Sequence, residues 1–318
     1  MNGGIGKIEM LIKTNILALV GGGKNPCFPP NNIIIWDDHQ GKIISKLRFN
    51  ENILNIRLRI DKVISILQKK IYIFNLKTLE TISIIDTFYN PSGIIAISDG
   101  DNNKLIISFP HESQNHVYVG NIISNKMEEI SQIATHNSKI SCLSINKDGT
   151  IIATTSAKGT IIRIFMTFGG VKFTEFPRGT KYVTMNCITF DQNNRFIGCT
   201  SNGRTLHIFS IIGIMKILNE NSQLNNKKGK NNLEEEPKNS KNLLGKIGGF
   251  LNIKSTYFES ERNFARFKIQ EPNRLLGFGN DNAFVVLTMD GKYYKVAYDP
   301  KNGGKSCKID EKDILIDI

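Results

Sequence analysis

The sequence has few cysteines, and none of them form a recognisable pair. Its five cysteines, at positions 27, 142, 187, 199 and 307, include no Cys-x-x-Cys spacing. An odd and scattered set argues against a disulfide framework and against a zinc site, and it indicates reduced thiols that mostly fill the core. We expect neither a metal nor a cofactor.

Long apolar runs are also missing. The longest run near the N-terminus, Ile16 to Val20, is too short for a signal sequence or a membrane span. We therefore predict a cytoplasmic protein that meets a membrane only at its surface.

Motifs for catalysis are lacking as well. The segment Gly21–Lys24 resembles a phosphate loop, but Ala18 stands where the first glycine is needed and Asn25 follows the lysine. We find no paired carboxylates, metal-ligand spacing or nucleophile elbow that would demand an enzyme. The sequence therefore favours a binding protein.

What the chain does have is a surplus of positive charge. It contains 41 basic and 29 acidic residues, for a formal net charge of +12. This surplus favours anionic partners such as nucleic acid, acidic membranes or phosphorylated ligands, and by itself it separates none of them. The 40% of apolar residues is enough for a sizeable core.

Short segments with the alternation of β-strands recur along the chain, and helical periodicity is nearly absent. The segments are Ile33–Asp37, Ile71–Asn75, His116–Val119, Ile162–Phe165, Leu206–Phe209 and Tyr293–Val296. Their anchors Trp36, Phe74, Val119, Phe165, Phe209 and Val296 are spaced by 38, 45, 46, 44 and 87 residues. The first four spacings match the period of roughly 40–45 residues of WD-type blades. The sequence therefore predicts an all-β, WD-repeat-like β-propeller as a single domain over residues 1–318.

The last spacing corresponds to one blade plus an insertion. Residues 219–242 are rich in Asn, Lys and Glu, so we expect a flexible insertion loop at 212–252 within the sixth blade, disordered over much of its length. The remaining residues suffice for roughly six blades. Either the propeller has six blades, or a seven-bladed type has largely lost its first blade. We favour the second, because Met1–Gly6 resembles the run-up to a strand.

The middle of the chain repeats one phrase around the segment Phe176-Pro177-Arg178-Gly179. The segments Ser156–Phe165 and Ser201–Phe209 each place hydroxyl groups and a cation at the start of an alternating strand. Such groups at the mouth of a strand can bind a phosphate. Two neighbouring repeat units are therefore predicted to carry one anion pocket each.

These motifs, together with Leu17–Pro26, Phe28–Asn31 and Ile35–Asp37, resemble the PROPPINs, the phosphoinositide-binding β-propellers of autophagy called the WIPI group in animals. The resemblance covers almost the whole chain, without the family's first blade. It implies a peripheral membrane protein that binds phosphatidylinositol 3-phosphate and phosphatidylinositol 3,5-bisphosphate. Its expected role is in autophagy or related membrane trafficking, on phagophore, endosomal or vacuole-like membranes.

The family carries two lipid pockets and a Phe-Arg-Arg-Gly motif whose arginines serve one pocket each. Carried over to this sequence, the blade-six pocket consists of Arg178, Ser201, Arg204, Thr205 and His207, and the blade-five pocket of His136, Ser156, Lys158, Thr160 and Arg163. Pro177 replaces the first arginine and has neither a charge nor a backbone N–H, so the blade-five pocket should be weakened although Lys158 and Arg163 remain. Arg204 stands one place later than the family's cation.

The resemblance also implies membrane insertion by the sixth-blade loop and recruitment of an autophagic lipid-transfer protein or other autophagy proteins. The insertion candidates are Leu243, Leu244, Ile247, Phe250 and Leu251. The loop Cys27–Asn32 offers Pro30 and Asn31 as partner contacts.

Other interpretations stay open at this point. The motif around Arg178 could be a surface turn, the histidines could hold loops, and the leucine-rich segment could pack against the propeller. A protein-only scaffold with vestigial lipid binding is the alternative function. A nucleic-acid binder rests on charge alone and is not expected, since few aromatic residues adjoin the basic ones. The sequence does not identify the preferred phosphoinositide or the organelle.

Overall fold

The computed structural model describes residues 2–100, 104–113, 115–123, 126–216, 218, 264–271, 274–279 and 282–314. The chain divides into two compact units, residues 1–135 and 136–318, which we call unit 1 and unit 2. Each unit contains three sheets, mostly antiparallel, which we number one to six in chain order.

Unit 1 is built from three four-stranded sheets. The first sheet consists of β1 (Ile5–Met10), β2 (Ile16–Gly21), β3 (Asn32–Asp37) and β4 (Lys42–Arg48). The second consists of β5 (Asn55–Leu58), β6 (Lys62–Ile66), β7 (Lys70–Asn75) and β8 (Thr81–Asp86). The third consists of β9 (Ala96–Ile97), β10 (Leu105–Pro110), β11 (His116–Ile123) and β12 (Lys126–Ala134).

Unit 2 repeats this plan. The fourth sheet consists of β13 (Ile140–Ile145), β14 (Ile151–Ser156), β15 (Ile161–Met166) and β16 (Lys172–Pro177). The fifth consists of β17 (Met185–Phe190), β18 (Phe196–Ser201), β19 (Thr205–Ser210) and β20 (Ala265–Lys268), and β24 (Gly304–Lys305) joins it in parallel with β20. The sixth consists of β21 (Arg274–Phe278), β22 (Ala283–Thr288), β23 (Lys292–Ala297) and β25 (Cys307–Asp313).

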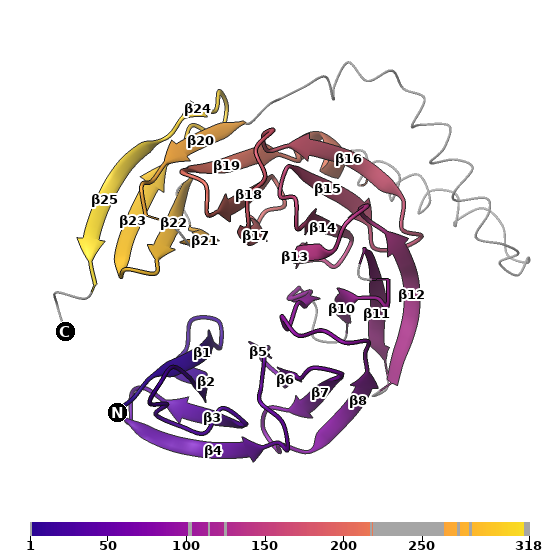
Figure 1. Cartoon of the computed structure of the whole chain (residues 1–318), viewed down its shortest axis with the longest axis vertical. Helices are drawn as coiled ribbons and strands as arrows, with labels where there is room; N and C mark the ends of the chain where they lie inside the picture. Colours follow the sequence, from indigo (N-terminus) through magenta and orange to yellow (C-terminus); the bar gives the residue numbers. More distant parts are fainter. Residues whose placement is uncertain are drawn as a thin grey trace, which may run out of the picture. The chain divides into compact units, whose positions relative to one another are not determined.

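The sheets have the arrangement of propeller blades. In unit 2 the first strands β13, β17 and β21 lie beside one another, while the outer strands β16 and β25 are far apart (Figure 1). All six segments predicted from their alternation form the third strand of a sheet, and the turn at Lys147–Thr150 connects β13 to β14. The predicted all-β propeller architecture is therefore confirmed.

The number of blades differs from the prediction. The described residues form six blades, and the expected seven-bladed type with a largely missing first blade is wrong in this respect. The reason lies in β1, which pairs antiparallel with β2 and so completes a four-stranded first sheet. What the sequence suggested as a run-up to a strand is itself this blade's first strand.

The predicted insertion at 212–252 falls mostly outside the described residues. Of that range, residues 212–216 form a short helical turn after β19, and 217 and 219–252 lie outside what the structure describes. The predicted flexibility of this loop therefore stays a prediction.

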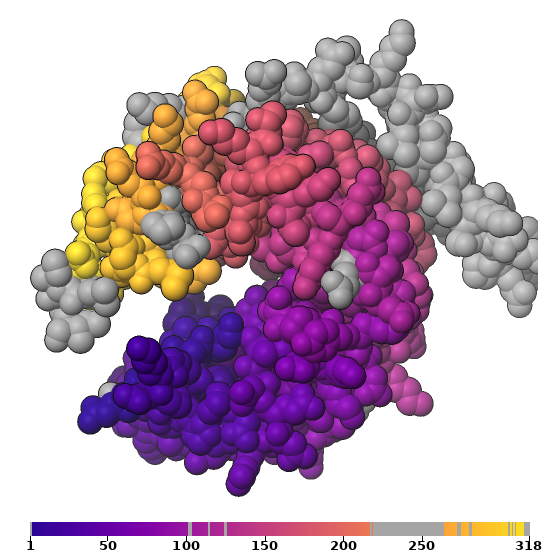
Figure 2. Space-filling model, viewed as in Figure 1, coloured from indigo at the N-terminus to yellow at the C-terminus, as the bar shows by residue number. Residues whose placement is uncertain are grey.

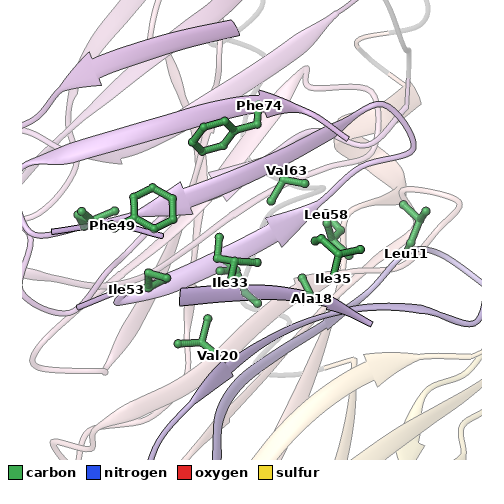
Figure 3. Close-up of a cluster of buried hydrophobic side chains, with 12 residues drawn as sticks. Leu11, Ala18, Val20, Ile33, Ile35, Phe49, Ile53, Leu58, Val63 and Phe74 are labelled. Carbon is green, nitrogen blue, oxygen red and sulfur yellow. The ribbon is translucent and has the colours of Figure 1, made fainter. Parts of the chain in front are cut away.

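Apolar side chains from neighbouring sheets form the core. In unit 1, Ala18 and Ile33 of the first sheet lie in one cluster with Val63 of the second (Figure 3). Alternate residues of each strand point to the same face, so two or three isoleucines or valines per strand are enough to cover it. Each such fully buried side chain contributes about 1.5–3 kcal/mol.

The same packing joins the fourth and fifth sheets of unit 2. Ile164 of β15 and Ile197 of β18 are fully buried in one cluster, which also contains Phe209 of β19. In the space-filling view the two sheets, coloured magenta to orange-red, form one continuous body (Figure 2). The predicted anion pockets lie at one edge of this pair of sheets.

Candidate anion-binding site

Arg178 follows the last residue of β16 and lies between the fourth and fifth sheets. Its backbone N–H donates to the carbonyl of Thr160 at 2.8 Å, which ties it to the turn between β14 and β15. Its side-chain Nε donates to the carbonyl oxygen of Gly159, and its Nη2 donates to that of Lys181. Two carbonyl groups therefore fix the plane of the guanidinium group before any ligand is present.

The remaining edge of this guanidinium faces the fifth sheet. A Cβ atom built on Gly203 would lie 4.0 Å from Arg178 Nη1 and 3.2 Å from Ser201 Oγ. A guanidinium group has five N–H donors, and the two carbonyl contacts occupy one each on Nε and Nη2. The donors on Nη1 are therefore oriented toward the turn that carries Ser201.

Burial also shapes the electrostatics around Arg178. Removal from water lowers the pKa of its guanidinium below the usual value, although an arginine stays charged at physiological pH. The nearby Cys199 is completely buried, and burial raises the pKa of its thiol to about 12. Because the thiol stays protonated, it does not neutralise the arginine, which keeps its charge for an anion.

Gly159 allows the turn beneath Arg178 to form. It has a φ of +62°, and a Cβ atom there would lie 2.2 Å from the carbonyl oxygen of Val183. A residue with a side chain would be strained by the backbone angle and blocked by this contact. The glycine predicted as part of the repeated phrase is therefore needed for the close approach of the two loops.

Ser201, Thr205 and His207 of the predicted blade-six pocket belong to the fifth sheet, which corresponds to the sixth blade of the seven-bladed numbering. Cys199 of β18 pairs with His207 of β19, and continuing this register places Ser201 opposite Thr205. Ser201 is buried and its Oγ accepts the N–H of Gly203 at 3.2 Å, whereas Thr205 is half-buried. Arg204 lies in the turn just before β19 and is exposed.

Aromatic packing positions the other members of this pocket. His207 is buried and stacks on Phe209, and Phe209 stacks on Phe176 with ring centroids 4.9 Å apart. Phe176 of the motif thus joins β16 to the fifth sheet. The structure places Phe176 and Arg178 beside the Ser201–Phe209 segment, while Gly179 is exposed next to Arg178.

The cations predicted for the blade-five pocket have other partners. Arg163 Nε donates to Glu175 Oε2 at 3.0 Å across the β15–β16 pair. Although partial burial raises the pKa of Glu175, hydrogen bonds from Lys172 and Arg163 bring it below its ordinary value. Lys158 lies with its Nζ 5.9 Å from the ring centroid of Tyr182.

The remaining blade-five residues add little positive charge. His136 Nε2 and Thr154 Oγ1 are hydrogen-bonded at 3.0 Å, and burial, followed by repulsion from Arg163, lowers the pKa of His136 to about 4. Ser156 is buried, and Thr160 is half-buried and accepts the Arg178 N–H through its carbonyl. Pro177 is exposed and pairs with Ile161. The blade-five pocket therefore has less available positive charge than its residue types suggest. Its histidine is neutral, its arginine is paired with Glu175, and Pro177 carries no charge.

Two residues near the site were missed by sequence reasoning. Glu175 stands two residues before Pro177 on the same strand, and the β15–β16 pairing that places it opposite Arg163 could have been inferred from the intervening turn at Phe168–Gly170. Tyr182 had no signal in the sequence beyond its place after the motif.

The predicted partner contacts lie in unit 1. Pro30 and Asn31 are half-buried, and both support the chain that leads into the second sheet. The carbonyl of Pro30 accepts the N–H of Ile53 at 3.0 Å, and Asn31 Nδ2 donates to the carbonyl of Phe49 at 2.8 Å. These contacts use part of their polar surface within the fold.

The insertion candidates Leu243, Leu244, Ile247, Phe250 and Leu251 lie outside the described residues. Among the residues that the structure does describe, no helix is long and apolar enough to cross a membrane. Within the same described part of the chain, no three His, Cys, Asp or Glu side chains are close enough to hold a metal ion.

Comparison with known proteins identifies the family to which the sequence is similar. The PROPPIN family model matches residues 8–315. Autophagy-related protein 18e of Arabidopsis thaliana is 27% identical over 306 residues, covering 96% of this chain and 75% of the relative. Autophagy-related protein 18 of Yarrowia lipolytica is 28% identical and covers 100% of this chain and 88% of the relative.

Solved structures of similar fold agree. Kluyveromyces lactis Hsv2 with its complete loop 6CD has a TM-score of 0.70 at 19% identity, covering 98% of this chain and 87% of that one. Atg21 of the complex "KlAtg21 with coiled-coil of AgAtg16" has a TM-score of 0.71 at 20% identity, covering 97% and 84%. At this identity the structures support the fold, and the family model supports membership. The chain belongs to the PROPPIN family.

Proposed function

We propose that this protein binds phosphoinositides on membrane surfaces, with Arg178 as the principal phosphate contact. The observation that carries the proposal is the orientation of the Arg178 guanidinium, which two carbonyl groups fix with Nη1 toward the Ser201–Gly203 turn. Guanidinium groups bind phosphate oxygens through paired N–H donors, and preorganisation reduces the entropy lost on binding. Ser201 and Thr205 supply hydroxyls beside it.

The ligand class follows from the family and the charge. Phosphatidylinositol 3-phosphate and phosphatidylinositol 3,5-bisphosphate carry phosphomonoesters that match one guanidinium with neighbouring hydroxyls. The net charge of +12 favours approach to an anionic bilayer. We propose a peripheral role in autophagy or related trafficking, on phagophore, endosomal or vacuole-like membranes.

Vesicle flotation tests the proposal. Arg178→Ala should weaken binding to vesicles containing phosphatidylinositol 3-phosphate by roughly tenfold or more, because a charge-assisted hydrogen bond contributes about 1.5–3 kcal/mol. Arg163→Ala is the matched control, since it removes the same charge from a residue already paired with Glu175. It should change binding about twofold or less.

The result that contradicts the proposal is equal flotation of Arg178→Ala and the parent protein. Vesicles in which phosphatidylserine supplies the same total charge separate headgroup recognition from general attraction. Equal binding to both kinds of vesicle would point to charge alone.

A protein-only scaffold is the second candidate function. The observation that favours it is the blade-five pocket, where Arg163 is paired with Glu175 and Pro177 offers no donor. A similar propeller has been solved with a coiled coil of Atg16, which makes another autophagy protein a reasonable partner class. Flotation of the parent protein decides between the two, because a scaffold with vestigial lipid binding would not float.

A further inference from the structure

Tyr182 is a large aromatic side chain that the fold holds out into solvent. It exposes 72% of its surface in the loop that connects β16 to β17. Among the described residues of unit 2, other aromatic side chains such as Phe196 and Phe209 are buried in the core. An exposed aromatic ring beside a proposed lipid site calls for an explanation other than core packing.

The loop that carries Tyr182 is fixed on both sides of it. Before it, the carbonyl of Lys181 accepts a hydrogen bond from Arg178 Nη2. After it, Val183 N–H donates to the carbonyl of Lys158 at 3.2 Å, and Thr184 N–H donates to Asn202 Oδ1 at 3.0 Å. Because backbone and side-chain contacts hold the loop, presentation of the ring to a partner requires little further ordering.

One lysine lies beside the ring, and two further basic residues belong to the same loop. Lys158 Nζ lies 5.9 Å from the ring centroid, and Arg178 and Lys181 are in the same loop. The segment 176–184 contains no acidic residue. An apolar ring with a polar tip, set among cations, has the composition of a side chain at the interface of an anionic bilayer.

We propose that Tyr182 is an interfacial anchor that enters the headgroup region of an anionic membrane while the Arg178 pocket holds an inositol phosphate. This inference rests on the proposed function and adds to it a specific membrane contact. The ring and the pocket are parts of one structure, since Arg178 bonds both the loop and the turn at Gly159. Lipid binding and aromatic insertion therefore occur at the same edge of unit 2.

Tryptophan fluorescence gives a direct test. The chain contains a single tryptophan, Trp36, so Trp36→Phe combined with Tyr182→Trp reports on this position alone. Vesicles containing phosphatidylinositol 3-phosphate should shift its emission to shorter wavelength, and lipids brominated near the headgroup should quench it. Phe168→Trp in the same background is the control, because Phe168 is also exposed and lies at the opposite end of β16. Its emission should not shift.

A second variant guards against misfolding of the tryptophan proteins. Tyr182→Ala in the parent background should weaken vesicle binding roughly fivefold, by loss of interfacial burial, and leave binding of soluble inositol 1,3-bisphosphate unchanged. Vesicle binding without an emission shift and without a Tyr182→Ala effect would overturn the anchor alone. Failure of the parent protein to bind vesicles would overturn the proposed function and the anchor with it.

Discussion

The fourth and fifth sheets of unit 2 contain the same repeated sequence motif, but the cations at the corresponding edge have different partners. In the fourth sheet Arg163 of β15 faces Glu175 across the strand pair, and His136 is neutral. Beside the fifth sheet, Arg178 is oriented by two carbonyl groups and forms no ion pair with a carboxylate among the described residues. The side chains and carbonyl groups around a cation, more than its presence in a motif, therefore determine whether it is available to an anion.

The largest difference between the two sheets is expected for substitutions of the turn glycines, Gly159 and Gly203. Gly159→Ala should destabilise the protein by about 3 kcal/mol or more, because the backbone has a positive φ and the new Cβ would meet the Val183 carbonyl at 2.2 Å. Gly203→Ala should have a much smaller effect, since its Cβ would lie 3.2 Å from the movable Ser201 hydroxyl. Chemical denaturation measures both, and equal destabilisation would show that the two turns are alike.

His136, which lies just before the fourth sheet, should make the stability of the protein depend on pH. The folded-state pKa of His136, about 4, lies below its unfolded value of about 6.5, so the unfolded state binds more protons between these values. The contribution of His136 to stability is therefore full above pH 6.5 and falls as the pH drops toward 4, by on the order of 3 kcal/mol.

Urea denaturation between pH 7 and pH 4 measures this loss. In His136→Gln the slope over that range should be reduced, because glutamine can still bond Thr154 and does not titrate. An unchanged slope would assign the pH dependence to other groups.

A gain-of-function variant tests whether the fourth sheet can bind lipid once its cations are available. Pro177→Arg combined with Glu175→Gln restores a cation to the motif and releases Arg163 from its carboxylate. Two weak sites on one protein act together on a membrane, so vesicle affinity should rise about tenfold or more. Titration of vesicles at increasing phosphoinositide density measures this change. If the affinity stays at that of the parent, the fourth sheet does not form a second lipid site.

The strand plan could be predicted from the sequence to a large extent. The six alternating segments were found because each carries three or four apolar residues with an aromatic or valine anchor, and all six are third strands. The number of blades was predicted wrongly because β1 was not recognised as a strand. Most of Ile5–Met10 is exposed, so this segment lacks the apolar alternation that marks a buried strand.

The sequence named candidate residues for the site, which stay a prediction, and it did not show how they are paired. Aligning the repeated phrases placed Lys158-Gly159-Thr160 against Gly203-Arg204-Thr205, but the two turns differ in length. β15 begins five residues after Ser156, whereas β19 begins four residues after Ser201. By strand register His207 corresponds to Arg163, as the anchors Phe165 and Phe209 also indicate, so the turns before these strands are where the two repeats differ. Contacts made by backbone carbonyls, such as those to Arg178, leave no trace in sequence.

The pairing of β19 with β20 affects where insertions and deletions can be tolerated during evolution. The two strands lie side by side, and Phe264 N–H donates to the carbonyl of Ile208 at 2.8 Å, so residues 211–264 leave and re-enter the sheet at nearly the same point. Doubling the length of a segment closed in this way costs only about 0.6 kcal/mol. Thr205 lies at the far end of β19 from that exit. Insertions and deletions can therefore accumulate in the connecting segment while Thr205 and the other residues of the proposed site keep their positions.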